Sequence, residues 1–178
     1  VEGQNECFRW SKGDWVLFVS DDVRMMPGCL QGMWDARFEG QVMPIINNPD
    51  GTIQSYGGKL VWPGYGINMG WPYNPRQRAY IPSICYLMPK GLWESVGGFD
   101  PAYPMAGEDV DMGLRLGRNR LKLAQATVIH LGNATLRYTD KDKWRFREAR
   151  IRLINKYFRG LDRWTRLLAM QALRYITN

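Results

Sequence analysis

Short apolar runs alternate with polar, glycine-rich breaks along most of the chain. Residues 15–19 form a continuous apolar run that ends in Ser20-Asp21-Asp22, a pattern typical of a buried parallel strand with a polar C-terminal tip. Similar runs predict strands over residues 42–46, 84–88 and 122–129, the last of which ends at His130. In open α/β sheets ligands bind at such strand tips.

Helical patterns fill the intervals between these runs. Helices are expected at residues 5–12, after Pro27-Gly28, and over residues 90–96 and 109–116. Strands separated by short helices predict an α/β domain with a mixed, largely parallel sheet flanked by helices. Residues 57–82 are rich in glycine, proline and aromatic residues without clean periodicity, so we expect a functional or mobile loop there.

The C-terminal part is helical and basic. From residue 141 onward two helices are expected, broken near Gly160. Residues 136–178 carry a formal net charge of +8, whereas the rest of the chain carries a net charge of −1. A near-neutral body with a basic tail indicates a local anionic partner and argues against a nucleic-acid-binding body. The tail therefore predicts either contact with an anionic membrane or, slightly favoured, a helical pair packed on a half of the domain that this sequence lacks, with its arginines solvated.

Length and cysteine content indicate the number of domains and the cellular compartment. A chain of 178 residues is long enough for one domain with a real core. Three widely spaced cysteines without a CxxC pattern favour a reducing compartment, and neither a signal peptide nor a long apolar span is evident. We expect a cytoplasmic protein that acts at the inner face of the membrane.

Asp21 and Asp22 are the first candidates for chemistry. Carboxylates at a strand tip are hard oxygen ligands, suited to Mg²⁺ or Mn²⁺ carrying a substrate diphosphate. The alternative is a solvated turn or a helix N-cap, where aspartate is common.

A second acidic cluster, Glu108, Asp109 and Asp111, opens the helix expected after residue 107. Helix capping explains some of these carboxylates, because the helix dipole favours negative charge at this end. The functional alternative is a general base that the helix N-terminus keeps ionised. His130, the only histidine, is either a structural residue or a metal ligand beside a carboxylate.

Taken together, these stretches resemble a known family. Four segments match in order and separation: GDWVLFVSDDV at 13–23, GGFD at 97–100, GEDVDMGLR at 107–115 and VIH at 128–130. The chain resembles the inverting nucleotide-sugar glycosyltransferases with the GT-A fold, especially rhamnosyl- and galactofuranosyl-transferase-like members that build cell-envelope polysaccharides. The resemblance spans residues 5 to about 135 and implies a partial GT-A domain over 1–135, lacking the first strand-helix-strand unit, and a basic helical extension over 136–178.

The resemblance also implies roles for individual residues. Asp22 corresponds to the last carboxylate of the DxD motif and, with His130, would hold Mg²⁺ or Mn²⁺. Ser20 and Asp21 would lie at the nucleotide. Asp109, or less favourably Glu108, would be the catalytic base. Substrate contacts are expected from Trp62, Trp71, Asp111 and Arg115. The partners implied are a nucleotide-sugar donor and a glycan or lipid-linked acceptor; nucleic acid is not expected.

Two other classes of function stay open. Ser20 stands where the family usually has Asp or Asn, which is compatible with a non-catalytic carbohydrate- or nucleotide-binding remnant. The basic tail is compatible with a module that binds membrane or nucleic acid. Metal-dependent hydrolysis of a nucleotide sugar separates the enzyme from the remnant. Salt-sensitive binding that survives deletion of residues 1–135 identifies the basic module.

Overall fold

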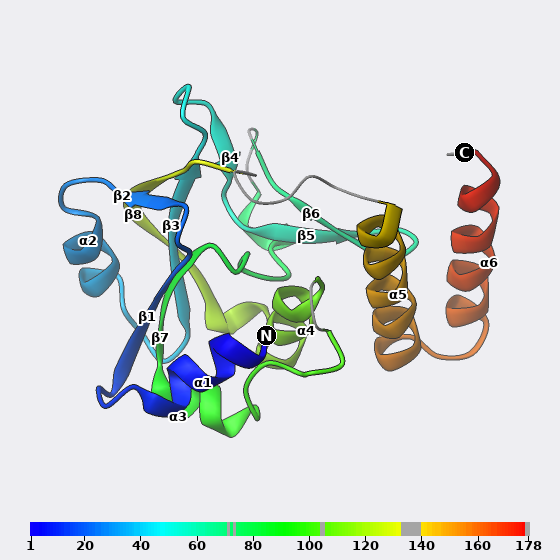
Figure 1. Cartoon of the computed structure of the whole chain (residues 1–178), viewed down its shortest axis with the longest axis horizontal. Coiled ribbons are helices and arrows are strands. Elements are labelled where there is room, and N and C mark those ends of the chain that lie inside the picture. Colours follow the sequence, from blue (N-terminus) through cyan, green and yellow to red (C-terminus); the bar gives the residue numbers. More distant parts are fainter. Residues whose placement is uncertain (71, 73, 104–105, 133–139, 177–178) are drawn as a thin grey trace.

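The computed structural model describes residues 1–70, 72, 74–103, 106–132 and 140–176. In this part of the chain a six-stranded sheet runs in the order β1-β7-β3-β8-β2, with β4 pairing to β3. Its strands are β1 (Trp15–Val19), β2 (Val23–Met25), β3 (Gln41–Asn47), β4 (Ile53–Ser55), β7 (Cys85–Pro89) and β8 (Leu121–His130). A separate hairpin consists of β5 (Gly58–Val61) and β6 (Tyr65–Asn68) (Figure 1). The predicted mixed α/β class is confirmed.

The prediction of a largely parallel sheet is wrong. Among the described strands only β3 and β8 pair in parallel, whereas β1 with β7, β7 with β3 and β2 with β8 are antiparallel. The apolar run of β1 reflects packing on both faces of the strand and carries no information about direction. Trp15 contacts Trp34 edge-on on one face, and Phe18 stacks on Tyr86 on the other.

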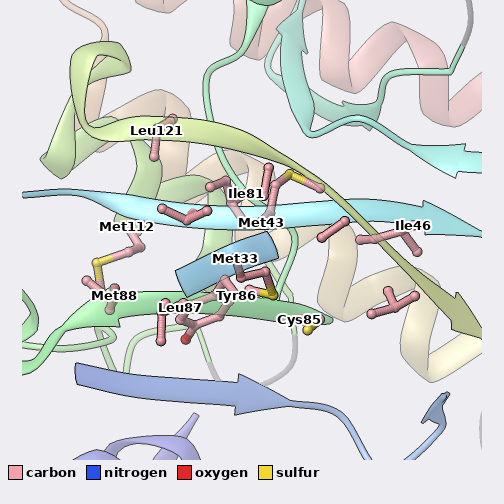
Figure 2. Packing of buried hydrophobic residues seen from close by; sticks show 14 of the residues in the cluster. Met33, Met43, Ile46, Ile81, Cys85, Tyr86, Leu87, Met88, Met112 and Leu121 are labelled. Carbon is pink, nitrogen blue, oxygen red and sulfur yellow. The ribbon is translucent and has the colours of Figure 1, made fainter. Parts of the chain in front are cut away.

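Helices cover both faces of this sheet. The side of α2 (Cys29–Asp35) that carries Cys29 and Met33 is buried against one face. On the opposite face, Phe8 of α1 (Glu2–Trp10) stacks on Trp93 of α3 (Lys90–Ser95), with ring centroids 4.9 Å apart. The side chains between these layers form the main core (Figure 2), which includes Met33, Met43, Ile46, Ile81, Cys85, Tyr86, Leu87, Met88, Met112 and Leu121.

The segment around Tyr80 joins the hairpin to α4 (Glu108–Leu116). A Cβ on Gly58 would overlap the Tyr80 ring, and a Cβ on Gly113 would overlap the backbone of residues 79 and 80. A Cβ on Gly66 would meet Val110 of α4 at 2.7 Å. These three glycines therefore permit a close approach that no larger residue allows, and they fix the hairpin beside the start of α4. Two short 3₁₀ turns, Pro75–Gln77 and Arg118–Arg120, complete this region.

The basic tail forms two helices, α5 (Asp140–Tyr157) and α6 (Gly160–Ile176), and the expected break at Gly160 is present. Ala149 and Leu153 of α5 are buried against Tyr80, Tyr103 and Val110. Figure 1 shows α5 beside the hairpin, with α6 on its outer side. Within the described ranges, no helix combines the length and the apolar character needed to cross a bilayer.

Candidate active site

Asp22 and His130 meet at the end of the β2–β8 pair. β2 begins at Val23, which lies opposite His130 in the antiparallel register, and the backbone N–H of Leu131 donates to Asp22 O at 2.8 Å. This register brings Asp22 Oδ2 to 3.0 Å from His130 Nε2. Both side chains are largely buried, with 22% and 14% of their surfaces exposed. The structure thus brings together the two residues expected to share a metal.

The other polar atoms of Asp22 and His130 differ in their hydrogen-bond partners. Nδ1 of His130 lies 2.9 Å from Oε1 of Gln54 on β4, so an Nδ1–H group can donate to that amide oxygen. Nε2 of the neutral ring then directs a lone pair toward Asp22 Oδ2, which is itself an acceptor. Asp22 Oδ1 is buried without a partner among the described residues. In the other tautomer Nε2–H donates to Asp22 Oδ2 and Nδ1 accepts from the Gln54 amide turned over, but Asp22 Oδ1 still lacks a partner among the described residues. A cation shared by the two side chains would satisfy these atoms.

The spacing fits a divalent ion. Two neighbouring ligands of an octahedral Mg²⁺ ion, each at about 2.1 Å, lie about 3 Å apart. A histidine ligand commonly donates its other ring N–H to an oxygen acceptor, which is the position Gln54 occupies. The described residues contain no group of three or more His, Cys, Asp or Glu side chains suited to a metal. Asp22 and His130 would therefore leave most of the coordination shell to substrate phosphate and water.

Ser20 and Asp21 form the turn that precedes this pair. Ser20 N donates to Ile84 O at 2.8 Å, and Ser20 O accepts from Val23 N at 3.2 Å, so the backbone of the turn is held at both sides. Asp21 is exposed and Ser20 is half-buried. Their side chains are thus available near the Asp22–His130 pair, and their expected role at the nucleotide stays a prediction.

Glu108 and Asp109 lie on the wall of a pocket of about 190 Å³. Gly107 precedes α4 with a φ of 87°, a left-handed conformation that favours glycine and turns the chain into the helix. Asp109 Oδ1 accepts from the Val110 N–H at 2.7 Å, and Glu108 Oε2 is buried without a described partner. Capping accounts for Asp109 Oδ1 and not for the buried Glu108 oxygen, and Ser83 lies within hydrogen-bond reach of both carboxyl groups.

The electrostatics of this pair differ from the expectation. We expected the helix N-terminus to keep Asp109 ionised at neutral pH, but burial of the carboxyl group opposes its ionisation. Burial, with the neighbouring charge of Glu108, raises the pKa of Asp109 to about 8, and burial also raises the pKa of Glu108. Loss of hydration and repulsion between two adjacent carboxylates outweigh the stabilisation by the helix dipole. Carboxylates with raised pKa values in a cleft are typical of functional sites.

The opposite wall of the pocket belongs to α5, which the sequence did not implicate. One face of this helix lines the cavity with Phe146, Ala149, Arg150 and Leu153. The guanidinium carbon of Arg150 lies 3.9 Å from the centroid of the Tyr65 ring in β6, which joins α5 to the hairpin. Spacing of i, i+3, i+4 and i+7 marks a shared helix face, but nothing local in the sequence shows what that face covers.

Asp111 and Arg115, expected at the substrate, make close contacts within the protein. Asp111 is fully buried and accepts from Arg115 Nε at 2.8 Å, Lys156 Nζ at 2.7 Å and Tyr157 Oη at 2.7 Å. Arg115 also donates to the carbonyl oxygens of Val96 and Gly98. This network holds α5 against α4, while Nη2 of Arg115 is buried without a partner among the described residues. A substrate contact of Asp111 and Arg115 stays a prediction.

Of the two tryptophans expected at the acceptor, only Trp62 lies among the described residues. Trp62 lies at the tip of the β5–β6 hairpin and is 61% exposed. It is not among the residues that line the described pocket. Trp71 lies outside the described residues. An acceptor role for both stays a prediction.

Known proteins supply a comparison for this geometry. No family model matches the chain. It is 32% identical to N-acetylglucosaminyl-diphospho-decaprenol L-rhamnosyltransferase of Mycobacterium tuberculosis, over 59% of this chain and 42% of the relative, with equal figures for two strains. It is 26% identical to the O-antigen biosynthesis protein RfbC of Myxococcus xanthus, over 75% of this chain and 12% of the relative. The chain thus spans less than half the length of these curated relatives.

A solved structure shares the fold. The chain superposes on GalNAc-T7, crystallised with UDP, GalNAc and Mn²⁺, with a TM-score of 0.59 and 12% identity. The match covers 84% of this chain and 35% of GalNAc-T7. By sequence the chain is similar to a rhamnosyltransferase and to an O-antigen biosynthesis protein, and by structure it shares the mixed α/β fold of GalNAc-T7.

Proposed function

We propose that this chain is part of an enzyme that transfers a sugar from a nucleotide-diphosphate donor to a hydroxyl group of a glycan or lipid-linked acceptor, with inversion and with a divalent metal. The observation that carries the proposal is the Glu108–Asp109 pair, two carboxylates with raised pKa values on the wall of a pocket. The names of the rhamnosyltransferase and RfbC relatives support the reaction class.

Asp109 is the proposed general base. The acceptor hydroxyl oxygen forms a bond to the anomeric carbon while the bond from that carbon to the donor diphosphate breaks, and the hydroxyl proton passes to the Asp109 carboxylate. Attack from the face opposite the leaving group inverts the anomeric centre. A carboxylate whose pKa is raised by burial is a stronger proton acceptor than an exposed one, and a pKa near the working pH suits a general base.

Asp22 and His130 are the proposed donor-side residues. Oδ2 of Asp22 and Nε2 of His130 would hold the ion, with Gln54 fixing the imidazole ring. A divalent cation there would neutralise negative charge on the leaving diphosphate. Since imidazole suits transition metals better than Mg²⁺, we favour Mn²⁺. Ser20 and Asp21, in the preceding turn, would contact the nucleotide.

A lipid-linked acceptor agrees with the outer surface of the tail. Leu161, Trp164 and Leu168 of α6 are 79%, 56% and 62% exposed. Their spacing of three and four residues places them along one stripe of the helix, and the tail carries a balance of +8. An apolar stripe on a basic helix suits the interface of an anionic membrane, so we propose peripheral contact at the inner face of a membrane.

The proposal is tested by incubating the protein with Mn²⁺, a panel of nucleotide sugars and an N-acetylglucosaminyl diphosphate acceptor. We expect release of nucleoside diphosphate that a chelator stops, and a product of inverted anomeric configuration by NMR. Nucleotide binding without metal-dependent release would indicate a non-catalytic remnant. A product of retained configuration would contradict the single-displacement mechanism.

A further inference from the structure

The pocket has a positive wall that the reaction described above does not use. Arg150 of α5 lines the cavity together with Glu108 and Asp109. Its guanidinium group lies over the Tyr65 ring, with the carbon at 3.9 Å from the centroid. Stacking of this kind leaves the N–H groups at the edge of the guanidinium plane available to a ligand.

Arg150 has no anionic partner in the described part of the chain. Neighbouring arginines on α5 and α6 do: Arg152 pairs with Glu148 at 2.9 Å and Arg166 pairs with Asp162 at 2.9 Å. Arg150 is half-buried, and this burial lowers its pKa, which shows that water does not fully solvate the charge. Although Glu108 and Asp109 line the same cavity, no ion pair joins Arg150 to either in the described chain. The Tyr65 side chain is also a hydrogen-bond neighbour of Arg150, but a neutral phenol does not balance the charge. A half-buried guanidinium without a counter-ion can still bind an anion.

We infer that Arg150 is a specificity-determining residue that binds a phosphate group of the acceptor, while the acceptor hydroxyl lies at Glu108 and Asp109. This inference rests on the proposed function. A sugar linked to a lipid through diphosphate carries its anionic group at the anomeric carbon and its reactive hydroxyl elsewhere on the ring. The pocket offers the same arrangement, with acids on one element, a cation on another and the apolar groups of Phe146, Val110 and Leu153 among the lining residues.

The size of the pocket agrees with this ligand. A volume of about 190 Å³ equals the share of on the order of six water molecules in the liquid, which is room for about one sugar ring. Tyr65 has a supporting role, because it holds the guanidinium flat and joins α5 to the hairpin. A planar guanidinium can donate two parallel hydrogen bonds to phosphate, which a lysine ammonium cannot reproduce.

The test compares two ligands by calorimetric titration: a short-chain alkyl diphosphate of N-acetylglucosamine, and the uncharged alkyl glycoside of the same sugar. The unmodified chain should bind the diphosphate at least about tenfold more tightly, since charge-assisted hydrogen bonds are the strong ones. Arg150→Gln should remove this preference while leaving the affinity for the uncharged glycoside unchanged, and Arg150→Lys should retain only part of it.

A matched control is available just after the end of α2. Arg37 also stacks on an aromatic ring, that of Trp34 at 4.2 Å, but it is exposed and remote from the pocket lining. Arg37→Gln removes the same charge and the same kind of contact, and it should leave the preference intact. If Arg150→Gln kept the preference, or if the unmodified chain bound both ligands equally, the inference about Arg150 would be overturned while the acceptor pocket stood.

Two further outcomes separate this inference from the proposed function. Binding of neither ligand would overturn the acceptor pocket itself, and the role of Arg150 with it. A third titration, with a nucleoside diphosphate and Mn²⁺, shows whether Arg150 binds phosphate of the donor or of the acceptor. Loss of that binding in Arg150→Gln, at unchanged acceptor affinity, would assign Arg150 to the donor and contradict the inference.

Discussion

Asp22 Oδ2 and His130 Nε2 lie 3.0 Å apart although 108 residues separate them in the chain. The β2–β8 register produces this contact, and Gln54 of β4 holds the other ring nitrogen. Three elements that are distant in sequence therefore converge on one imidazole. This is the arrangement expected where a protein fixes the orientation of a metal ligand.

The first prediction concerns Gln54. Gln54→Leu should lower Mn²⁺ affinity, measured with a nucleoside diphosphate present, by about 10- to 100-fold, because the ring of His130 loses the group that orients it. Electron paramagnetic resonance of free Mn²⁺ gives the affinity directly. Gln31→Leu removes an amide from the exposed surface of α2 and serves as the control. Equal affinities in both variants would show that Gln54 does not support a metal ligand.

Local sequence patterns predict the four acidic and histidine residues of the candidate site, but they do not predict Gln54 or Arg150. Apolar runs bounded by polar residues place Asp22 and His130 at strand ends, and the glycine and acidic residues before 110 place Glu108 and Asp109 at a helix start. Gln54 and Arg150 carry no such signal, because their roles depend on β4 pairing to β3 and on α5 packing across the hairpin. Strand direction in β1 is hidden for the same reason, since pairing is not local.

The pKa of Asp109 shows a second limit of local reasoning. The helix N-terminus is visible in the sequence and favours the ionised form. Burial of Asp109 is visible only in the fold. Tyr80 and Tyr86 lie close enough that their own pKa values, raised mainly by burial, are raised further by the charges of Glu108 and Asp109. This nonlocal effect opposes the one that the sequence shows.

The second prediction is a dependence of stability on pH. The pKa of Asp109 is about 8 in the folded chain and about 4 when unfolded, so ionisation favours the unfolded state increasingly as pH rises between these values. Asp109→Asn should therefore raise Tm at pH 8 by at least about 2 °C, the shift expected for about 1 kcal/mol in a chain of this length, and by much less at pH 4. Scanning calorimetry at the two pH values measures this, with exposed Asp14→Asn as the control. A lower Tm at pH 8 would contradict the raised pKa.

The third prediction concerns the buried contacts between α4 and α5. Asp111→Ala removes the carboxylate that Arg115, Lys156 and Tyr157 share. Loss of a buried partner typically lowers stability by about 3 kcal/mol, so denaturant unfolding should show a decrease of that order. Glu148→Ala breaks the exposed Glu148–Arg152 pair of α5 and should change stability by less than about 1 kcal/mol. Similar effects from the two variants would mean that Asp111 does not hold the helices together.

The fourth prediction concerns membrane contact. Trp164→Ala should weaken binding to vesicles that contain anionic lipid, because it removes an apolar side chain from the exposed stripe of α6. Co-sedimentation at low and high salt separates the apolar from the electrostatic contribution. Trp10 of α1 is 79% exposed on another element, so Trp10→Ala is a matched control. Equal binding to neutral and anionic vesicles would exclude the electrostatic part of the proposal.

The most direct measurement is the turnover number of Asp109→Asn in an active preparation, compared with Glu108→Gln and Asp22→Asn. General-base catalysis is typically worth ~10²–10⁴-fold, so Asp109→Asn should lower turnover by at least about 100-fold while donor affinity stays nearly unchanged. Asp22→Asn should instead weaken metal-dependent donor binding first. If Glu108→Gln abolished turnover and Asp109→Asn did not, the base would be the neighbouring residue. If Asp109→Asn and Glu108→Gln both retained normal turnover, the proposed base, and with it the central claim, would be wrong.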